Sequence, residues 1–230
     1  MASVTDICNY ALSIIGSATG DSRYLETFDG NPSDTSSLDT MKWCQLLYPR
    51  ARDYALIQLA PPECIAYADC GTYLDDEDCV TAPGWEYFYQ KPTDALCILG
   101  VLIDALDSYA TEMFVPHQEV QDQIACNYSS DVQFKYVKRL EDTAKFSEGL
   151  IMAVAHRLAY LLAKPLGVSE EVRQSLLIQF KDALAEARML NGQRKYRKAP
   201  ELTVENAHYR KTTGSVVLRE VDGSLRVVSY

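Results

Sequence analysis

Residues 146–190 read FSEGLIMAVAHRLAYLLAKPLGVSEEVRQSLLIQFKDALAEARML. Apolar residues recur every three or four positions on both sides of PLGV at 165–168, which is typical of two amphipathic helices. We predict one helix over about 143–164 and a second that begins at Ser169, and the short connection predicts antiparallel neighbours. The residues expected to face inward are Phe146, Leu150, Val154, Leu158, Leu161 and Leu162, then Val172, Leu176, Phe180, Ala183, Ala187 and Leu190.

The ends of both helices carry recognisable signals. Pro165 and Gly167 close the first helix. In the second, the hydroxyl of Ser169 can cap free N–H groups, and two glutamates follow at the positive end of the helix dipole. Asn191-Gly192 predicts the C-terminal stop.

Two more helices are predicted before residue 60. The first covers about 4–15, with Ser3 and Asp6 as a capping pair and Gly16 as a stop. The second covers about 38–58, and Pro49 predicts a kink or a break inside it. The residues expected to face inward are Ile7, Cys8, Ala11, Leu12, Ile14 and Ile15, then Met41, Cys44, Leu47, Tyr48, Ala51, Tyr54 and Ala55.

Residues 61–140 have the character of a small β module. Trp85, Tyr87 and Tyr89 alternate with other residues, which predicts a half-buried strand. Further strands are expected over 96–103, 118–126 and 132–137. An acidic run reads as an exposed loop; it consists of Asp75, Asp76, Glu77 and Asp78.

The last 38 residues, 193–230, differ in charge from the rest of the chain. They carry a net charge of +4, whereas residues 1–192 carry −14. Two apolar runs, 216–221 and 224–228, flank Asp222-Gly223, and this pair favours a two-residue hairpin turn. An isolated hairpin is marginal in water. We therefore predict a docking arm that carries a hairpin.

The fold class predicted from these patterns is α+β. Helices from the N- and C-terminal parts of the body form an antiparallel bundle around one core, because the two N-terminal helices cannot bury their apolar faces alone. The expected organisation is N-terminal helices over 1–60, an inserted β module over 61–140, a C-terminal helix pair over 141–192, and an extended C-terminal arm over 193–230.

The sequence offers few signs of chemistry. It contains no common catalytic or nucleotide-binding motif, so we expect no enzyme and no cofactor. His156, in a predicted helix, is interpreted as structural rather than as a base. A zinc site would have to use Cys64, Cys70, Cys79 and His117, whose spacing matches no common zinc module, so no metal is expected.

Composition restricts the setting of the chain. The seven cysteines are spread out and odd in number, which favours reduced thiols in a cytosolic compartment. The start lacks the basic region of a signal peptide, and no apolar run is long enough for a membrane helix, so no membrane is expected. A pI near 4.8 argues against wrapping nucleic acid.

The order of these elements resembles the head-to-tail adaptor of tailed bacteriophages, the family called tail tubular protein A or gatekeeper. The opening helix at 7–16, the spacing of Cys44, Tyr48, Arg52 and Leu56, and the strand and Pro-x-Asp turn at 87–96 carry the resemblance. So do 146–166 and 183–188 in the closing helix pair. The stretches 61–83 and 193–230 match no family motif.

The resemblance implies a structural connector in a virion, at the head–tail junction, with assembly in the host cytoplasm. About twelve copies would form a ring under the portal protein and continue the DNA channel toward a tail nozzle or tail-tube protein. The contact with DNA would be transient, because an acidic body repels phosphates. The acidic run at 75–78 could then line the channel.

For the arm, three interpretations stay open. It docks on the portal or a neighbouring subunit, it binds DNA as a replication-accessory protein would, or it folds back on its own subunit. In the first interpretation, strand edges pair with a partner sheet and aromatic residues anchor the contact. The docking residues would be Arg194, Lys195, Tyr196, Arg197, Lys198, Tyr209, Val216, Leu218, Val227, Val228 and Tyr230.

Overall fold

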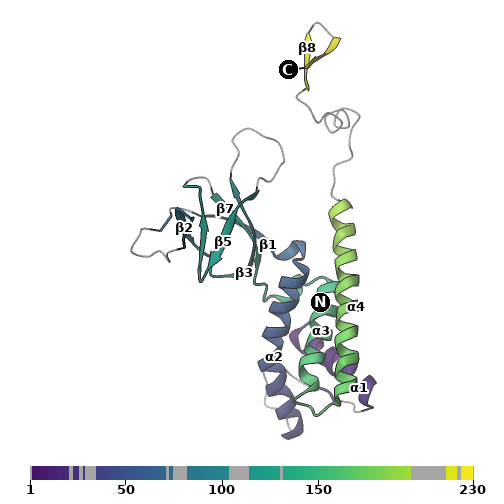
Figure 1. Ribbon diagram of the computed structural model, residues 1–230. Coiled ribbons are helices and arrows are strands. Elements are labelled where there is room, and N and C mark those ends of the chain that lie inside the picture. Colours follow the sequence, from purple (N-terminus) through teal and green to yellow (C-terminus); the bar gives the residue numbers. More distant parts are fainter. Residues whose placement is uncertain are drawn as a thin grey trace. The chain divides into compact units, whose positions relative to one another are not determined.

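The computed structural model describes residues 2–20, 23–25, 28, 35–70, 73–74, 82–103, 114–129, 132–197, 216–221 and 224–229. The chain divides into two compact units, Met1–Asn191 and Gly192–Tyr230. The described part of the first unit contains four helices and two small antiparallel sheets, so the fold is mixed α+β (Figure 1).

Helix α1, Val4–Thr19, begins with the predicted capping box. The Ser3 hydroxyl accepts a hydrogen bond from the Asp6 N–H at 3.1 Å, and the Asp6 carboxylate accepts one from the Ser3 N–H at 2.8 Å. All six residues expected to face inward are buried. The predicted stop at Gly16 is wrong: the helix continues to Thr19 and ends at Gly20, whose φ of 76° gives the left-handed cap.

Helix α2, Thr35–Leu59, runs without a break through Pro49, so the helix is not interrupted there. Proline removes one backbone donor, but buried residues on both sides, including Cys44 and Ala51, hold the flanking turns against the core. The inward placement of Tyr54 is also wrong, because this side chain is 39% exposed.

Helix α3, Glu148–Ala163, follows a short 3₁₀ turn, η2, at Thr143–Lys145. The chain then turns at Gly167, whose φ is 74°, and α4 runs over Glu170–Arg197. The Ser169 hydroxyl accepts from the Val172 N–H at 3.5 Å, as expected for a cap. The predicted stop at Asn191-Gly192 is wrong, and Leu190, expected inside, is 40% exposed.

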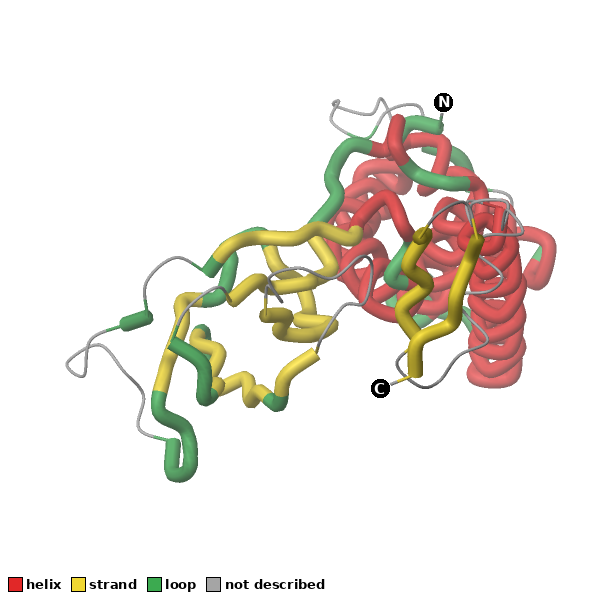
Figure 2. Tube along the Cα trace, turned by 90° about the horizontal axis from the view of Figure 1, so that it is seen from above, coloured by secondary structure: helices red, strands yellow, loops and turns green. Residues whose placement is uncertain are grey.

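The four helices share one apolar core. Figure 2 looks down on the helices and shows them as one group. Helices α3 and α4 approach each other closely at Gly149 of α3. A Cβ added there would lie 3.1 Å from the Cβ of Ala187 on α4, so a larger residue would require Ala187 to move. Fully buried residues of the core include Ile7, Ala11, Cys44, Ala55, Leu56, Leu150, Val154, Leu158, Leu162, Leu176 and Phe180.

The inserted segment begins with the 3₁₀ turn η1, Pro62–Cys64, and forms two antiparallel sheets. One has the order β1-β7-β3-β4, from strands Ile65–Asp69, Val132–Lys138, Ala95–Ile103 and Phe114–Val115. The other has the order β2-β6-β5, from Tyr87–Gln90, Gln123–Cys126 and His117–Val120. A second apolar cluster contains Tyr89, Ile98, Val101, Val115, Ile124, Cys126, Val132, Phe134 and Tyr136.

Several features of the sheets differ from the sequence prediction. The sequence predicts neither β1 nor β4; Ile65–Asp69 is a strand because it pairs along β7, and Phe114–Val115 because it pairs with β3. The single strand expected over 118–126 is a hairpin, β5 and β6, with Gln121 at a φ of 56° in its turn. In β2, the adjacent residues Phe88 and Tyr89 are both buried. Adjacent side chains of a strand point to opposite faces, so both faces of β2 are covered and the predicted alternation of buried and exposed residues is wrong.

The second unit contains one described strand pair. Strands β8, Val216–Val221, and β9, Ser224–Ser229, pair antiparallel. The register sets Leu218 opposite Val227 and Val217 opposite Val228. The expected turn residues Asp222 and Gly223 lie outside the described residues.

Candidate interaction surfaces

The residues predicted to dock fall into three groups. Arg194, Lys195, Tyr196 and Arg197 belong to the last turns of α4, so the backbone there is helical. Val216 and Leu218 lie in β8, and Val227 and Val228 in β9. Outside the described residues are Lys198, Tyr209, Tyr230 and the acidic run Asp75, Asp76, Glu77 and Asp78.

Two of the residues considered for chemistry, His156 and Cys64, are placed for packing. Burial lowers the pKa of His156, its Nδ1 has no hydrogen-bond partner, and its ring meets Tyr10 edge-on at 6.3 Å between ring centres. Burial raises the pKa of the Cys64 thiol to about 12. Within the described ranges, no three His, Cys, Asp or Glu side chains gather as metal ligands would.

A charged network joins the helices to the inserted sheets. Arg52 of α2 is buried, and its Nε donates to the Asp53 carboxylate at 2.9 Å. The same carboxylate lies 3.2 Å from Nε of Arg139, which follows β7, and Glu141 lies 3.7 Å from Nη2 of Arg52. The Arg139 N–H also donates to the carbonyl of Asp94 in the Pro-x-Asp turn, at 2.8 Å. These contacts fasten α2 to the strands.

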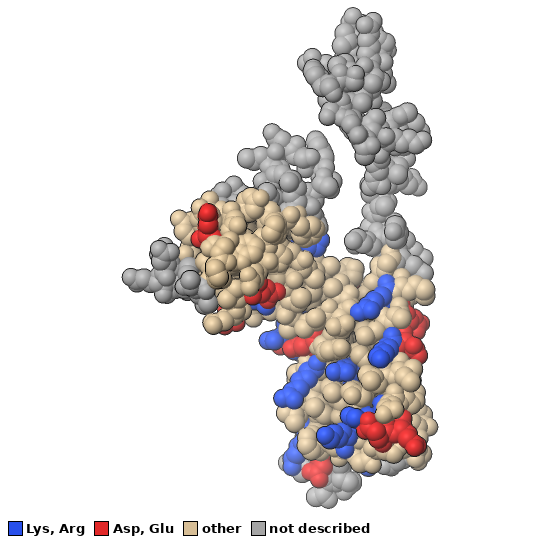
Figure 3. Space-filling view, in the orientation of Figure 1, with Lys and Arg blue, Asp and Glu red and all other residues tan. Residues whose placement is uncertain are grey.

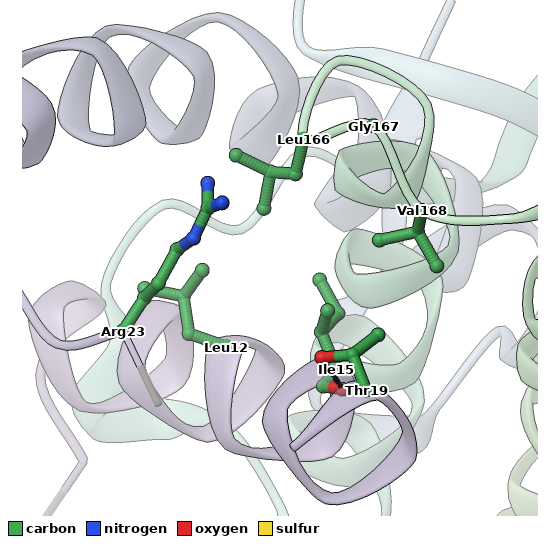
Figure 4. Close-up of a pocket in the computed structure, with 7 residues that line it drawn as sticks. All are labelled: Leu12, Ile15, Thr19, Arg23, Leu166, Gly167 and Val168. Atoms are coloured by element: carbon green, nitrogen blue, oxygen red, sulfur yellow. Dashed lines mark hydrogen bonds between the residues drawn. The ribbon is translucent and has the colours of Figure 1, made fainter. Parts of the chain in front are cut away.

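A small pocket lies between α1 and the α3–α4 turn (Figure 4). Its volume is about 160 Å³, and its walls are Leu12, Ile15, Thr19, Arg23 and the turn 166–168. In Figure 4 the Arg23 side chain extends toward Leu166. The walls are part apolar and part polar, and Arg23 is their one charged group, so this pocket holds no acid–base pair.

The outer side of the larger sheet carries an exposed aromatic surface. We call it the sheet surface, and it consists of Tyr67, Leu99, Phe114 and Lys135. Tyr67 and Phe114 are 52% and 54% exposed. The Lys135 ammonium lies 5.4 Å from the Tyr67 ring centre and 5.6 Å from that of Phe114. The Phe114 ring lies over Gly100, where a Cβ would be 2.2 Å from the ring.

A second surface follows the line where α2 and α4 meet over α3, and we call it the α2–α4 seam. Its members are Tyr54 and Gln58 of α2, Arg157 and Tyr160 of α3, and Arg173 and Arg188 of α4. The buried ring of Phe180 contacts Tyr54 and Arg157 from the core side. Figure 3 shows basic side chains gathered on this side of the helices, with acidic ones toward the edges.

Sequence reasoning missed both surfaces. Arg157 and Arg188 are ordinary helix residues in the sequence, and arginines on a helix usually point to solvent. A weak signal exists in α2, where Trp43, Leu46, Tyr54 and Ile57 form a second apolar stripe at helical spacing. All four are at least 39% exposed. Such a doubled stripe indicates a helix that packs on both sides.

Among the described helices, none is both long enough and apolar enough to cross a membrane. A scan against protein-family models found no match for this chain, and a search of curated proteins found none either.

Proposed function

We propose that this chain is a structural head-to-tail connector, or adaptor, of a phage virion. Copies of it would form a ring of about twelve that joins the portal to the tail and continues the DNA channel. In this proposal the helices act as an antiparallel bundle, the sheets as an inserted module, and residues 193–230 as a docking arm with a hairpin. The partners are the portal and a downstream tail nozzle or tail-tube protein.

The observation that supports this function best is the presence of two unlike exposed surfaces on one unit. The α2–α4 seam is rich in arginine, whereas the sheet surface is mainly aromatic. A ring needs two different surfaces on each copy, because its contacts are heterologous and each copy meets its neighbours with opposite sides. Along the chain, two helices precede the strands of the inserted segment and two follow them, which is the organisation that this proposal uses.

The experiment is to mix the purified chain with portal particles and to examine the product by mass photometry and electron microscopy. We expect a closed ring seated on the portal. A chain that remains monomeric and leaves the portal bare, across protein concentrations up to saturation, would contradict the proposal.

The arm is tested with a chain that ends at Gly192. If residues 193–230 dock on the portal, this shortened chain binds the portal poorly while remaining folded. Gly223→Val tests the hairpin, since a β-branched residue is strained in a turn that needs positive φ angles. Full portal binding by the shortened chain would argue against a docking arm.

A second function, DNA binding as a replication-accessory protein, is favoured by one observation. The continuation of α4 to Arg197 places Arg194, Lys195 and Arg197 on a regular helix. A basic helix can follow a phosphate backbone, and its affinity then falls steeply with salt. Salt-sensitive binding to a DNA duplex, lost when Arg194, Lys195, Arg197 and Lys198 are neutralised, would support this second function.

A further inference from the structure

Arg157 holds a guanidinium group without a carboxylate. Its Cζ lies 4.1 Å from the centre of the Tyr54 ring, 5.3 Å from Tyr160 and 5.4 Å from Phe180. Its Nε is buried and makes no hydrogen bond. In the described part of the chain no acidic side chain pairs with it. Three rings hold the charge in place, but rings supply no acceptor in the plane of the guanidinium group for its N–H donors.

The rest of the α2–α4 seam adds basic charge. Arg188 is exposed, and its Nη2 donates to the Gln58 carbonyl at 3.0 Å, again with no acidic partner among the described residues. Arg173 packs on Tyr160 and pairs with Glu170 at 2.7 Å. Tyr54 and Gln58 are one helical turn apart, so the two unpaired guanidinium groups contact α2 about 6 Å apart.

The opposite charge lies elsewhere in the same chain. All fourteen Lys and Arg of residues 1–192 fall in the described ranges, whereas twelve of the 28 Asp and Glu do not. The densest of these acids are the four consecutive ones, Asp75–Asp78, which follow the apolar pair Tyr73-Leu74. Charge complementarity therefore exists between the seam and an acidic segment of this chain.

We propose that the α2–α4 seam is a docking surface for the acidic run Asp75–Asp78 of a second copy of this chain. The inference rests on the proposed function in one respect, that copies meet in a heterologous contact. Because Nε of Arg157 is buried, a carboxylate from outside would receive its two parallel N–H bonds from the two terminal nitrogens, Nη1 and Nη2. The exposed sides of Tyr54 and Ile57 are available to pack on apolar neighbours of the acids.

The contact is tested by reversing charge on each side of it. The seam variant carries Arg157→Glu and Arg188→Glu, and the segment variant carries Asp75→Lys, Asp76→Lys, Glu77→Lys and Asp78→Lys. Each variant alone should associate with itself about 30-fold or more weakly than the wild type, because like charges then face each other. The measurement is sedimentation velocity over a range of concentrations, with the portal added if wild-type rings form only on it.

A mixture of the two variants shows whether the acidic segment contacts the seam of another copy or the seam of its own copy. In an equimolar mixture each seam meets a segment of opposite charge on the other variant, so association should return. A chain that carries both sets of changes should also associate. If that chain associates but the mixture does not, the segment binds within its own copy, and the proposal of a second copy is overturned.

A matched control changes the charge by the same amount elsewhere. Lys42→Glu with Lys145→Glu alters two cations that are 62% and 66% exposed and that pair with acids of their own turns. This control should associate like the wild type. Because Arg157 is partly buried, Arg188→Glu alone serves as the second variant, with circular dichroism as the check on folding; it too should weaken association.

The outcomes keep this inference distinct from the proposed function. If the wild type forms rings and the seam variant forms them equally well, the docking contact is wrong and the connector function stands. If the wild type forms no ring with or without the portal, both are wrong. If Arg157→Glu instead abolishes salt-sensitive binding to a DNA duplex and leaves association unchanged, the seam binds phosphate and the proposed occupant is wrong.

Discussion

Because Gly100 has no side chain, the Phe114 ring of the sheet surface can lie over it. This residue of β3 lies beneath the Phe114 ring, and a Cβ there would be 2.2 Å from Phe114 Cδ1. The ring can therefore approach the backbone of β3 closely, while Phe114 as a whole stays 54% exposed. The sequence marks Gly100 only as an interruption in an apolar run, because the ring that covers it comes from a different strand.

We predict that Gly100→Ala lowers the free energy of unfolding by about 1–3 kcal/mol, since the added methyl displaces the ring. Phe114→Ala should cost less and should remove most of the cost of Gly100→Ala. The measurement is a double-mutant cycle by urea denaturation. An equal cost of Gly100→Ala with and without the Phe114 ring would show that this contact is unimportant.

His156 makes stability depend on pH. Burial lowers the pKa of His156 below its usual 6.5, so the unfolded chain takes up the proton first as the pH falls. The stabilisation is fully present above about pH 6.5 and decreases as the pH drops toward the folded pKa. We predict that His156→Gln flattens this part of the profile, measured by urea denaturation between about pH 5 and pH 8. Parallel profiles for the two proteins would contradict the assignment.

At the scale of elements, three residues that commonly interrupt or end a helix lie inside helices of this structure. Gly16, Pro49 and Gly192 each suggested an interruption, and helices run through all three. In α1 and α2, burial of residues on both sides of the weak position outweighs a local cost of about 1 kcal/mol for glycine and about 3 kcal/mol for proline. The glycines that do end helices, Gly20 and Gly167, have positive φ values of 76° and 74°.

Two glycines of the C-terminal helices should therefore respond oppositely to alanine. Gly192 is helical with nothing within 4 Å of an added Cβ, so Gly192→Ala should stabilise α4 by about 0.5–1 kcal/mol. Gly167→Ala should destabilise by about 1 kcal/mol, because its φ of 74° disfavours an L side chain. Urea denaturation and helical ellipticity measure both. If Gly192→Ala also destabilised, Gly192 would be a helix end after all.

At the scale of the whole molecule, the charge is unevenly placed. Residues 1–192 carry −14, but the described residues of that range hold sixteen acids and fourteen bases. The acidic body inferred from composition is thus close to neutral over its helices and sheets, and most of its excess acid lies outside the described ranges. A channel lining that repels DNA would have to come from those acids.

The two apolar clusters lie entirely within Met1–Asn191. We predict that a chain ending at Gly192 retains its free energy of unfolding to within about 1 kcal/mol, because no cluster residue is removed. Chemical denaturation followed by tryptophan fluorescence measures this. A shortened chain that unfolds at much lower denaturant would show that residues 193–230 pack on the first unit, which is the fold-back interpretation of the arm.

Periodicity and capping alone were enough to place the four helices, three strands of the inserted segment and nearly all of the helical core. Ser3 with Asp6 and the spacing in 146–190 are examples, since such signals act between residues a few positions apart. Strand β1, the β5–β6 hairpin, the ring over Gly100 and the arginine of the α2–α4 seam required the tertiary structure. Each depends on a partner distant in sequence, as Ile65 depends on Val137 and Arg157 on Tyr54, and such contacts leave no local periodicity.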